Sequence, residues 1–419
     1  MRVLFATIGS LGDLHPCLSL AVALKRRGHS VAIASTEIYR AKVLALGFDF
    51  HSLRPNWDPA DSALIRQCED IKSGPEVLIR KLVLPQLEDT YADLMKAAQE
   101  CDFMLAGELL YAAPLVAEKL KIRWASIILS PCSFLSAYDP SLLVNVPQLI
   151  WLRGAGWRVN RAFLNIGNRS IRNWWEPVRR LRVKEGLDPD CEPLTRDKFS
   201  PTLVLALFAA ALAEPQPDWP KNTVQTGFAF YDGNAGDADL SQLASFLAPG
   251  EAPVVFTLGS TAVACPGNFY PASQEAILKL GKRALLIGAH DFESRSNQIL
   301  AVPYLPYSRV FEHASVIVHQ GGSGTTGQAL RAGRPMLIVP FGWDQPDNAL
   351  RVKRLGVGLS LARQDYSAGS LSAVLDRLMR ESSFAKRAAE VAEQLKSQDG
   401  TREACDAVEK AMHVGTTLV

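Results

Sequence analysis

The stretch from His319 to Pro335, HQGGSGTTGQALRAGRP, is rich in glycine and follows a short apolar run that ends at His319. A glycine-rich turn at the start of a helix leaves several backbone N–H groups uncovered by side chains, and such groups bind phosphate. Ser323, Thr325 and Thr326 add hydroxyl donors, and His319 can donate to a phosphate oxygen. The stretch therefore predicts a phosphate site, although glycine-rich turns with a purely structural role are also common.

Strands and helices alternate on both sides of this stretch. Near the N-terminus, the run Arg2–Thr7 leads through a glycine-rich turn into a helix that Pro16 opens and that ends near Gly28, and the buried run Ser30–Ser35 follows. Continuous apolar strands joined by helices are typical of parallel sheets. Further strands are predicted at Phe103–Ala106, Trp124–Leu129, Pro253–Leu258, Ala284–Ile287, Val316–His319 and Met336–Pro340, with a helix at Ala112–Leu120. The pattern predicts an α/β protein with two similar halves.

The length of the chain predicts two domains, because 419 residues exceed what one hydrophobic core usually serves. Between the halves, the proline-rich segment Glu214–Pro220 is unsuited to a helix or a central strand. We predict an N-terminal domain over 1–213, a linker over 214–237 and a C-terminal domain over 238–400. A C-terminal helix within 401–419 is expected to pack back on the N-terminal domain.

Composition excludes several classes of protein. Hydrophobic residues make up 48% of the chain and the net charge is only +2, so a nucleic-acid partner is not expected. The seven cysteines contain no CxxC pair and no carboxylate cluster has metal-ligand spacing, so we expect no disulfide, metal or cofactor. The longest apolar run, Leu203–Ala213, is shorter than the roughly 20 residues of a membrane span. The sequence predicts a soluble, cytoplasmic protein.

Motifs along nearly the whole chain resemble the family 1, UDP-glycosyltransferase-like GT-B enzymes. The glycine-rich stretch is preceded by Tyr304-Leu-Pro306 and followed by Pro340-Phe-Gly-Trp-Asp-Gln-Pro-Asp-Asn348, and the N-terminal turn reads Gly9-Ser-Leu-Gly-Asp-Leu-His-Pro16. Phe256-Thr-Leu-Gly-Ser-Thr261 is similar to the bacterial branch that contains the rhamnosyltransferase subunit of rhamnolipid synthesis. The resemblance implies a GT-B fold, in which two Rossmann-like domains face each other across a cleft. It also implies that the N-terminal domain binds the acceptor and that the C-terminal domain binds a nucleotide-sugar, which is a co-substrate.

Family roles carry over to matching residues of this chain. Tyr304, with Leu305 and Pro306, stands where an aromatic ring stacks on the donor base, and His319 stands where a histidine contacts the diphosphate. Asp344 and Gln345 stand where an acid–amide pair binds sugar hydroxyls. The other donor-binding positions line the phosphate turn or approach it from other loops: Gly12, Gly259, Ser260, Thr261, Gly321, Gly322, Ser323, Gly324 and Thr325.

Asp13 is the candidate general base. It follows the first predicted strand, at the edge where α/β sheets bind ligands, and it occupies the family's Gly-[His/Asp]-x-x-Pro position. A carboxylate can take the acceptor proton late in the transition state. The alternative is that Asp13 only caps the helix that Pro16 begins. His15 is less favoured, and Glu108 lies near the place where plant relatives carry an aspartate that orients a catalytic histidine.

One position departs from the plant pattern. Gly327 stands where plant members carry a glutamate that holds both ribose hydroxyls, so both UDP-sugars and dTDP-sugars are candidate donors.

The resemblance implies metal-independent transfer of a hexose to an acceptor hydroxyl, with inversion at the anomeric carbon. A nucleotide-sugar epimerase and a non-catalytic binding partner are the alternatives. The resemblance together with the Asp13 motif argues against an epimerase, and the intact set of Asp13, His319, Asp344 and Gln345 argues against a partner that only binds.

The segment from about 140 to 185 differs from the rest of the chain. Nine basic residues lie between Arg153 and Lys184 against a single acid, Glu176, and the tryptophans of the segment are Trp151, Trp157, Trp174 and Trp175. Two interpretations are open: a pair of amphipathic helices with a solvated basic face, or a surface for an amphiphilic acceptor or an anionic membrane. Loops near 55–90 and 130–180 are the expected walls of the acceptor pocket.

Overall fold

The computed structural model of the chain describes residues 1–57, 61–142, 153–233, 241–248, 250–290, 292–294 and 296–413. The chain forms two compact units, and both are discontinuous in sequence. Unit 1 comprises Met1–Asp61, Lys72–Phe230 and Asp399–Val419, and unit 2 comprises Ser62–Ile71 and Tyr231–Gln398. The division thus falls between Phe230 and Tyr231, inside the predicted linker. Residues 62–71, which the sequence assigns to the N-terminal domain, belong to unit 2 instead.

Unit 1 is built on a parallel sheet of seven strands in the order β3-β2-β1-β4-β5-β6-β7. The strands are β1 (Arg2–Ala6), β2 (Ser30–Ser35), β3 (Asp49–Ser52), β4 (Phe103–Gly107), β5 (Arg123–Ile128), β6 (Leu203–Ala206) and β7 (Thr223–Gln225). In the central strand β1, Leu4 lies beside Ala32 on one side and Met104 on the other. Nearly all of β1 is buried, as expected for a central parallel strand.

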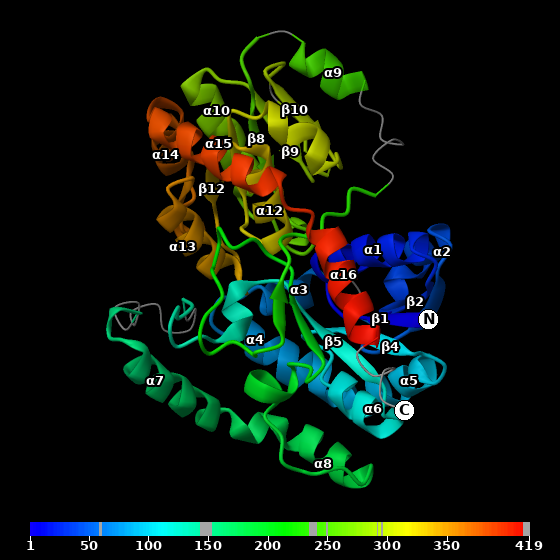
Figure 1. The fold of residues 1–419 in the computed structure, drawn as a ribbon. Helices are drawn as coiled ribbons and strands as arrows, with labels where there is room; N and C mark the ends of the chain where they lie inside the picture. The colour runs from blue at the N-terminus through cyan, green and yellow to red at the C-terminus, as the bar shows by residue number, and fades with distance from the viewer. Residues whose placement is uncertain are drawn as a thin grey trace. The chain divides into compact units, whose positions relative to one another are not determined.

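Helices cover the sheet of unit 1 on both faces (Figure 1). On one face, α5 (Leu87–Ala98), α6 (Ala113–Leu120) and α8 (Glu176–Lys184) share a core with Leu4, Met104 and Trp175. Two other helices, α1 (Leu11–Arg26) and α16 (Gly400–His413), pack against each other. The remaining main helical segments are α2 (Arg40–Ala45), α4 (Gly74–Glu76), α7 (Trp157–Ser170), and the π-helical η2 (Val77–Val83) and η7 (Pro193–Asp197).

The helix α1 begins earlier than the sequence predicts. Its N-cap is Ser10, whose hydroxyl accepts from the Gly12 N–H, and the Asp13 carboxylate accepts from the Ser10 N–H in return. This reciprocal pair is a capping box, which starts the helix at Leu11. Pro16, predicted as the first helical residue, lies inside the helix, so that prediction is wrong.

The helix α16 is held on α1 by charged contacts. Arg27 pairs with Asp406 at 2.6 Å and with Glu409 at 2.7 Å. At the start of α16, a Cβ on Gly400 would lie 2.5 Å from the Phe228 carbonyl oxygen, so only glycine allows this approach. The sequence expects a C-terminal helix against the N-terminal half, and α16 occupies that place in unit 1.

Unit 2 repeats the same plan with a parallel sheet of six strands in the order β10-β9-β8-β11-β12-β13 (Figure 1). The strands are β8 (Val254–Thr257), β9 (Ala284–Ile287), β10 (Ile299–Val302), β11 (Val316–His319), β12 (Met336–Ile338) and β13 (Gly358–Ser360). β8 and β11 lie side by side at the centre, with Val254 and Val316 in register. The two parallel sheets confirm the predicted α/β class.

The helices of unit 2 cover its sheet and include one N-terminal segment. α10 (Phe269–Leu280) and α14 (Ala368–Arg380) share a core with Phe256 and Val318, and α12 (Ser323–Ala332) packs on α15 (Ser382–Lys396). The others are α3 (Ser62–Cys68), α9 (Ser241–Leu247), α11 (Tyr307–Val310) and α13 (Gln345–Leu355). Because α3 contacts residues 262–264, the segment 62–71 belongs to this unit.

Candidate active site

Asp13 lies in the first turn of α1, next to the exposed Gly12, after the loop that follows β1. Its Oδ2 accepts from Ser10 N at 2.8 Å and from Ser10 Oγ at 3.2 Å. A Cβ on Gly9 would lie 2.4 Å from this oxygen, so the loop requires glycine there. Asp13 therefore supports the start of the helix, and its role as general base stays a prediction.

The surroundings of Asp13 change its acidity. Burial raises the pKa of Asp13 to about 6, the nearby Glu108 carboxylate adds to the rise, and the hydrogen bonds from Ser10 oppose it. The Tyr39 hydroxyl donates to the Gly9 carbonyl oxygen of the same loop at 3.1 Å. A carboxylate whose pKa lies closer to neutrality is a better general base than an ordinary aspartate.

Glu108 follows β4 and is held by partners that the sequence does not indicate. Lys198 Nζ lies 3.5 Å from Glu108 Oε2, and the Leu129 N–H donates to Oε1 at 3.4 Å. Sequence reasoning missed Lys198 because it lies 90 residues from Glu108 along the chain. The two side chains line a small pocket together with Tyr111 and Trp124.

His319 ends β11, and its side chain is fully buried. Nδ1 accepts from the Gly321 N–H at 3.0 Å, which places the ring proton on Nε2. Burial lowers the pKa of His319 to about 3, so the ring is neutral. Nε2 is buried and has no hydrogen-bond partner among the described residues. A buried donor without an acceptor is costly, and a ligand oxygen is the kind of acceptor that would satisfy it.

The glycine-rich turn after His319 leads into α12, whose N-cap is Gly322 and has no side chain to cap the first turn. Gly321 has a φ of +96°, and a Cβ there would lie 2.6 Å from Ile338 Cγ2. A Cβ on Gly324 would meet no atom within 4 Å, so the space beside it is open. Uncapped N–H groups and the positive end of the helix dipole favour an anion at this turn.

The loop after β8 lies beside the glycine-rich turn that follows His319, which is the predicted phosphate turn. A Cβ on Gly259 would lie 2.2 Å from Gln320 Nε2, so any larger residue there would displace the Gln320 side chain. Ser260 is exposed and Thr261 is half-buried. The Thr261 side chain hydrogen-bonds to Glu69, which sequence reasoning missed because Glu69 lies far from every donor motif.

The turn that precedes α13 is held by the predicted sugar-binding residue Gln345. Its Oε1 accepts from the Phe341 N–H at 2.8 Å and from the Gly342 N–H at 3.2 Å. Trp343 has a φ of +60°, a left-handed conformation that costs a non-glycine residue about 1–2 kcal/mol. The amide oxygen of Gln345 therefore stabilises a strained turn, a role that the sequence does not indicate.

Hydrogen bonds from Asn348 connect Asp344 with the phosphate turn. The side-chain amide of Asn348 donates to Asp344 Oδ2 at 2.8 Å and to the Gly321 carbonyl oxygen at 2.9 Å. Asp344 itself is half-buried at the N-cap of α13. The structure thus brings Asp344 and the phosphate turn together within unit 2.

Tyr304 presents its ring to solvent and is 66% exposed, whereas Leu305 and Pro306 behind it are buried. The following Tyr307 hydroxyl bonds to Thr257 Oγ1 at 2.9 Å and also to Thr325 of the phosphate turn. An exposed ring on an anchored loop is suited to stacking on a planar base.

The tryptophans of the basic segment lie in different environments. Trp175 is buried in the core and meets Tyr111 edge to face, with ring centroids 5.0 Å apart. Trp174 is half-buried, and Trp157 is 42% exposed and stacks on Tyr138 at 5.5 Å. Trp151 lies outside the described residues. Trp175 is therefore a core residue of unit 1, whereas Trp157 lies at the surface.

Two further features are absent from the described part of the chain. It contains no group of three or more histidines, cysteines and acids that could hold a metal ion. None of its helices combines the length and the hydrophobicity that crossing a bilayer requires.

Known families match both halves of the chain. Residues 3–131 match the glycosyltransferase family 28 N-terminal domain, and residues 275–411 match the erythromycin biosynthesis protein CIII-like, C-terminal domain. Over its full length the chain is 27% identical to O-mycaminosyltylonolide 6-deoxyallosyltransferase of Streptomyces fradiae and covers 99% of that protein. The chain is a GT-B glycosyltransferase.

Other relatives of this glycosyltransferase differ more in length or sequence. It is 27% identical to sterol 3-beta-glucosyltransferase of Emericella nidulans but spans only 30% of that protein's length. The structure of glycosyltransferase VinC in complex with dTDP is similar in fold, with a TM-score of 0.68 and 22% identity over 99% of this chain and 100% of VinC. The predicted GT-B fold and glycosyltransferase class are confirmed, whereas the roles of single site residues stay predictions.

We expect the glycosyltransferase to lose activity below about pH 6. If Asp13 is the base, kcat/KM requires the carboxylate form of Asp13. Its raised pKa of about 6 then means a roughly tenfold loss of kcat/KM per pH unit below that value.

The free energy of unfolding should change in the same pH range. The folded state binds the Asp13 proton more tightly than the unfolded state, so the contribution of Asp13 to stability is greatest below pH 3.8 and is lost as the pH rises through about 6. A pH–rate profile of kcat/KM checks the first expectation, and an acid limb near pH 4 would contradict it.

Proposed function

We propose that this enzyme moves a hexose from a UDP- or dTDP-sugar to a hydroxyl of a small amphiphilic or aromatic acceptor, with inversion and without a metal ion. The observation that carries the proposal is the buried Nε2–H of His319 beside the uncapped first turn of α12. These groups are donors of the kind that a nucleoside diphosphate requires.

In the proposed reaction, the acceptor oxygen forms a bond to the anomeric carbon while the bond from that carbon to the diphosphate oxygen breaks. Asp13 takes the acceptor proton, and nucleoside diphosphate leaves with the electron pair. The N-terminus of α12 and the His319 Nε2–H stabilise the charge that develops on the leaving group. Attack on the face opposite the leaving group gives inversion.

Release of nucleoside diphosphate in the presence of an alcohol acceptor tests the proposal directly. Mass spectrometry of the products should show the acceptor increased by one hexose. An epimerase would convert the donor without any acceptor, and a binding partner would bind the donor without turnover, so each alternative has its own outcome.

The choice of nucleotide is expected to be relaxed. Gly327 is buried in α12, where a glutamate would be needed to hold both ribose hydroxyls. Since a deoxyribose lacks the 2′-hydroxyl, dTDP-glucose should be used at least as well as UDP-glucose, and the dTDP named with VinC points the same way. Matched kinetics on the two donors check this. A UDP preference above about 10²-fold, equal to about 2.7 kcal/mol, would show that other residues contact the 2′-hydroxyl.

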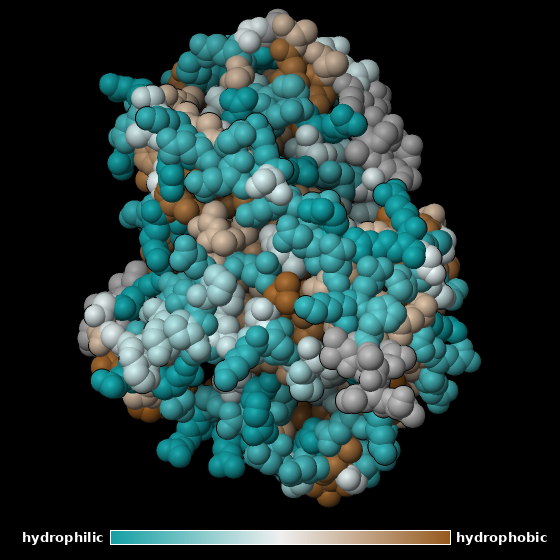
Figure 2. All heavy atoms as spheres, viewed as in Figure 1, coloured by the Kyte–Doolittle hydropathy of each residue, from teal (hydrophilic) through white to brown (hydrophobic). Residues whose placement is uncertain are grey.

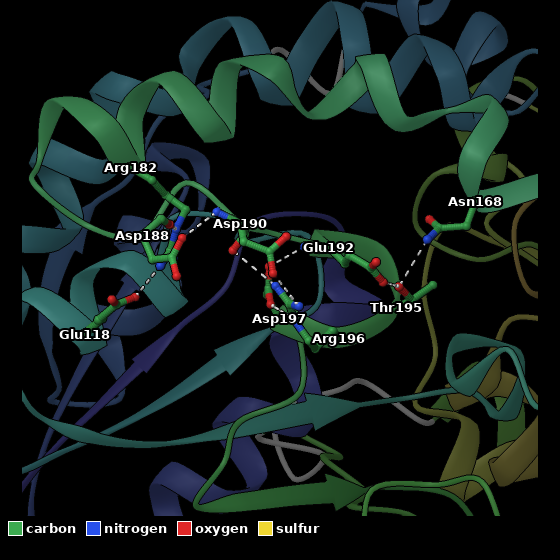
Figure 3. Close-up of polar contacts among 9 residues, drawn as sticks. All are labelled: Glu118, Asn168, Arg182, Asp188, Asp190, Glu192, Thr195, Arg196 and Asp197. Carbon is green, nitrogen blue, oxygen red and sulfur yellow. Dashed lines mark hydrogen bonds and ion pairs between the residues drawn. The ribbon is translucent and has the colours of Figure 1, made fainter. Parts of the chain in front are cut away.

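The proposed class of acceptor rests on the helix α7. Two asparagines of this helix face the rest of unit 1. Asn160 is the only buried residue among the fourteen of α7, and its side-chain amide donates to the Ala137 carbonyl oxygen at 3.0 Å. Further along, Asn168 Nδ2 lies 3.5 Å from Thr195 Oγ1 in η7 (Figure 3). The inward face of α7 therefore includes two amides that bond to neighbouring segments.

Leu164 lies four residues from both Asn160 and Asn168, on the inward face of α7. Four other apolar residues lie on another side of the helix. At spacings of three and four they form one stripe, called here the α7 stripe: Val159, Ala162, Phe163 and Ile166. Val159 is 45% and Ile166 is 68% exposed, and hydrophobic residues appear among hydrophilic ones over α7 in Figure 2. Arg158 and Arg169 flank the stripe, and α7 contains no acid. An exposed apolar stripe beside arginines suits an amphiphilic acceptor or an anionic membrane surface.

We expect turnover with a 3-hydroxy fatty acid or with an aromatic or terpenoid alcohol to exceed turnover with a simple sugar. The sterol relative is named for an apolar alcohol, which favours the same class. Turnover on a 3-hydroxy fatty acid, a flavonoid and a simple sugar checks this. Preference for the simple sugar would exclude an apolar acceptor.

Sedimentation with phosphatidylglycerol vesicles at low and physiological salt tests the membrane contact. Binding that weakens with salt and is lost in the double variant Val159→Asn/Ile166→Asn would support it. Leu44→Asn, at a residue that is 50% exposed elsewhere in unit 1, is the matched control. Absence of vesicle binding with turnover on aromatic alcohols would leave only an apolar acceptor pocket.

A further inference from the structure

The segment 62–71 brings an acid from the N-terminal part of the chain into unit 2. Glu69 follows α3 and is only 3% exposed. A Cβ on Gly342 would lie 3.2 Å from the Glu69 carbonyl oxygen, so the turn over residues 341–345 packs on the backbone of Glu69. Since Glu69 also contacts Thr261, it adjoins two loops that hold predicted donor residues.

The Glu69 carboxyl group has one oxygen without a partner. The Thr261 side chain hydrogen-bonds to Glu69, but Oε2 is buried and has no hydrogen-bond partner among the described residues. Burial raises the pKa of Glu69, which Thr261 and Arg363 only partly oppose. Arg363 is itself engaged elsewhere, because it donates to the Cys265 carbonyl oxygen at 3.1 Å. Buried polar atoms in proteins are nearly always paired, so Oε2 is a candidate ligand atom.

We propose that Glu69 binds a hydroxyl of the donor hexose through Oε2. This inference rests on the proposed function. Thr261 is predicted to line the diphosphate and Asp344 to bind sugar hydroxyls, so a group that adjoins both loops lies where the hexose of the donor would be. The Gln345 oxygen is already used by its own turn, and Glu69 supplies an acceptor in its place.

The test compares Glu69→Gln with Asp70→Asn, a matched change at the exposed acid next in sequence. Calorimetry with the nucleotide-hexose and with the nucleoside diphosphate alone separates sugar contacts from phosphate contacts. Glu69→Gln is expected to weaken binding of the nucleotide-hexose about tenfold to hundredfold, the range for a hydrogen bond to a charged group. Binding of the diphosphate should stay within about twofold, and Asp70→Asn should match the wild type.

A series of donors that each lack one hexose hydroxyl identifies the contact. Loss of the contacted hydroxyl should weaken binding to the wild type more than binding to Glu69→Gln, because the amide forms only a weaker, neutral hydrogen bond to that hydroxyl. Equal loss of diphosphate and nucleotide-hexose affinity, or no loss at all, would overturn the assignment. If wild-type protein binds the donor but never transfers the hexose, the proposed function fails while this binding comparison still decides the role of Glu69.

Discussion

Replacing Asp13 with asparagine is expected to reduce glycosyl transfer by at least about 10²-fold, in line with general-base contributions, while nucleoside diphosphate binds as before. Asparagine has the same shape and can still accept from the Ser10 N–H, so the start of α1 should persist. It cannot take the acceptor proton at this position. Turnover measured beside calorimetric titration with nucleoside diphosphate separates catalysis from binding.

A helix-capping role for Asp13 leads to a different result, which a second capping box controls for. In α14, Ser367 is the N-cap and Ser370 occupies the position that Asp13 has in α1. Ser370→Ala should lower stability by about 0.5–2 kcal/mol with little effect on turnover. If Asp13→Asn behaves in the same way, Asp13 is a structural residue only.

Replacing His319 with alanine is expected to weaken nucleoside diphosphate binding by about 1.5–3 kcal/mol, because a hydrogen bond to a charged phosphate is lost. Catalysis should fall as well, since the same contact stabilises the leaving group. Calorimetry gives the affinity and initial rates give kcat/KM.

His319→Asn is the control for the structural part of this histidine. The asparagine oxygen can accept from the Gly321 N–H in place of Nδ1, but the shorter side chain has no donor at the position of Nε2. The variant should therefore fold like the wild type and bind diphosphate as weakly as His319→Ala. Wild-type affinity in both variants would remove His319 from the phosphate site.

Much of the fold could be predicted because parallel strands have a strong local pattern. Buried runs such as Arg2–Ala6 and Val316–His319 are continuous and apolar, and the glycine-rich turns mark where helices follow. The strands β7 and β13 have three residues each and only one large apolar side chain, so they show no such pattern. The placement of residues 62–71 in unit 2 depends on tertiary contacts that no local pattern records.

The residues of the candidate site also differ in whether the sequence alone could predict them. Asp13 and His319 stand in motifs with a physical reason for each residue type, so the sequence indicates both. Lys198 beside Glu108 and Glu69 beside Thr261 join residues far apart in the chain, and only the folded structure brings them together. The start of α1 was mispredicted because proline is common in a first helical turn, whereas the Ser10–Asp13 box fixes the actual start.

The docking of α16 on α1 has a consequence for the order in which the chain folds during synthesis. Unit 1 includes α16, which the ribosome makes only after all of unit 2. Until then, α1 lacks the partners of Arg27 and the glycine contact that seats Gly400 against Phe228. Domains generally fold from the N-terminus as they emerge, but here the first sheet to be made waits longest for its last helix. Unit 2 can complete its own fold first, and the nascent chain therefore carries an unfinished N-terminal unit throughout the synthesis of its second half.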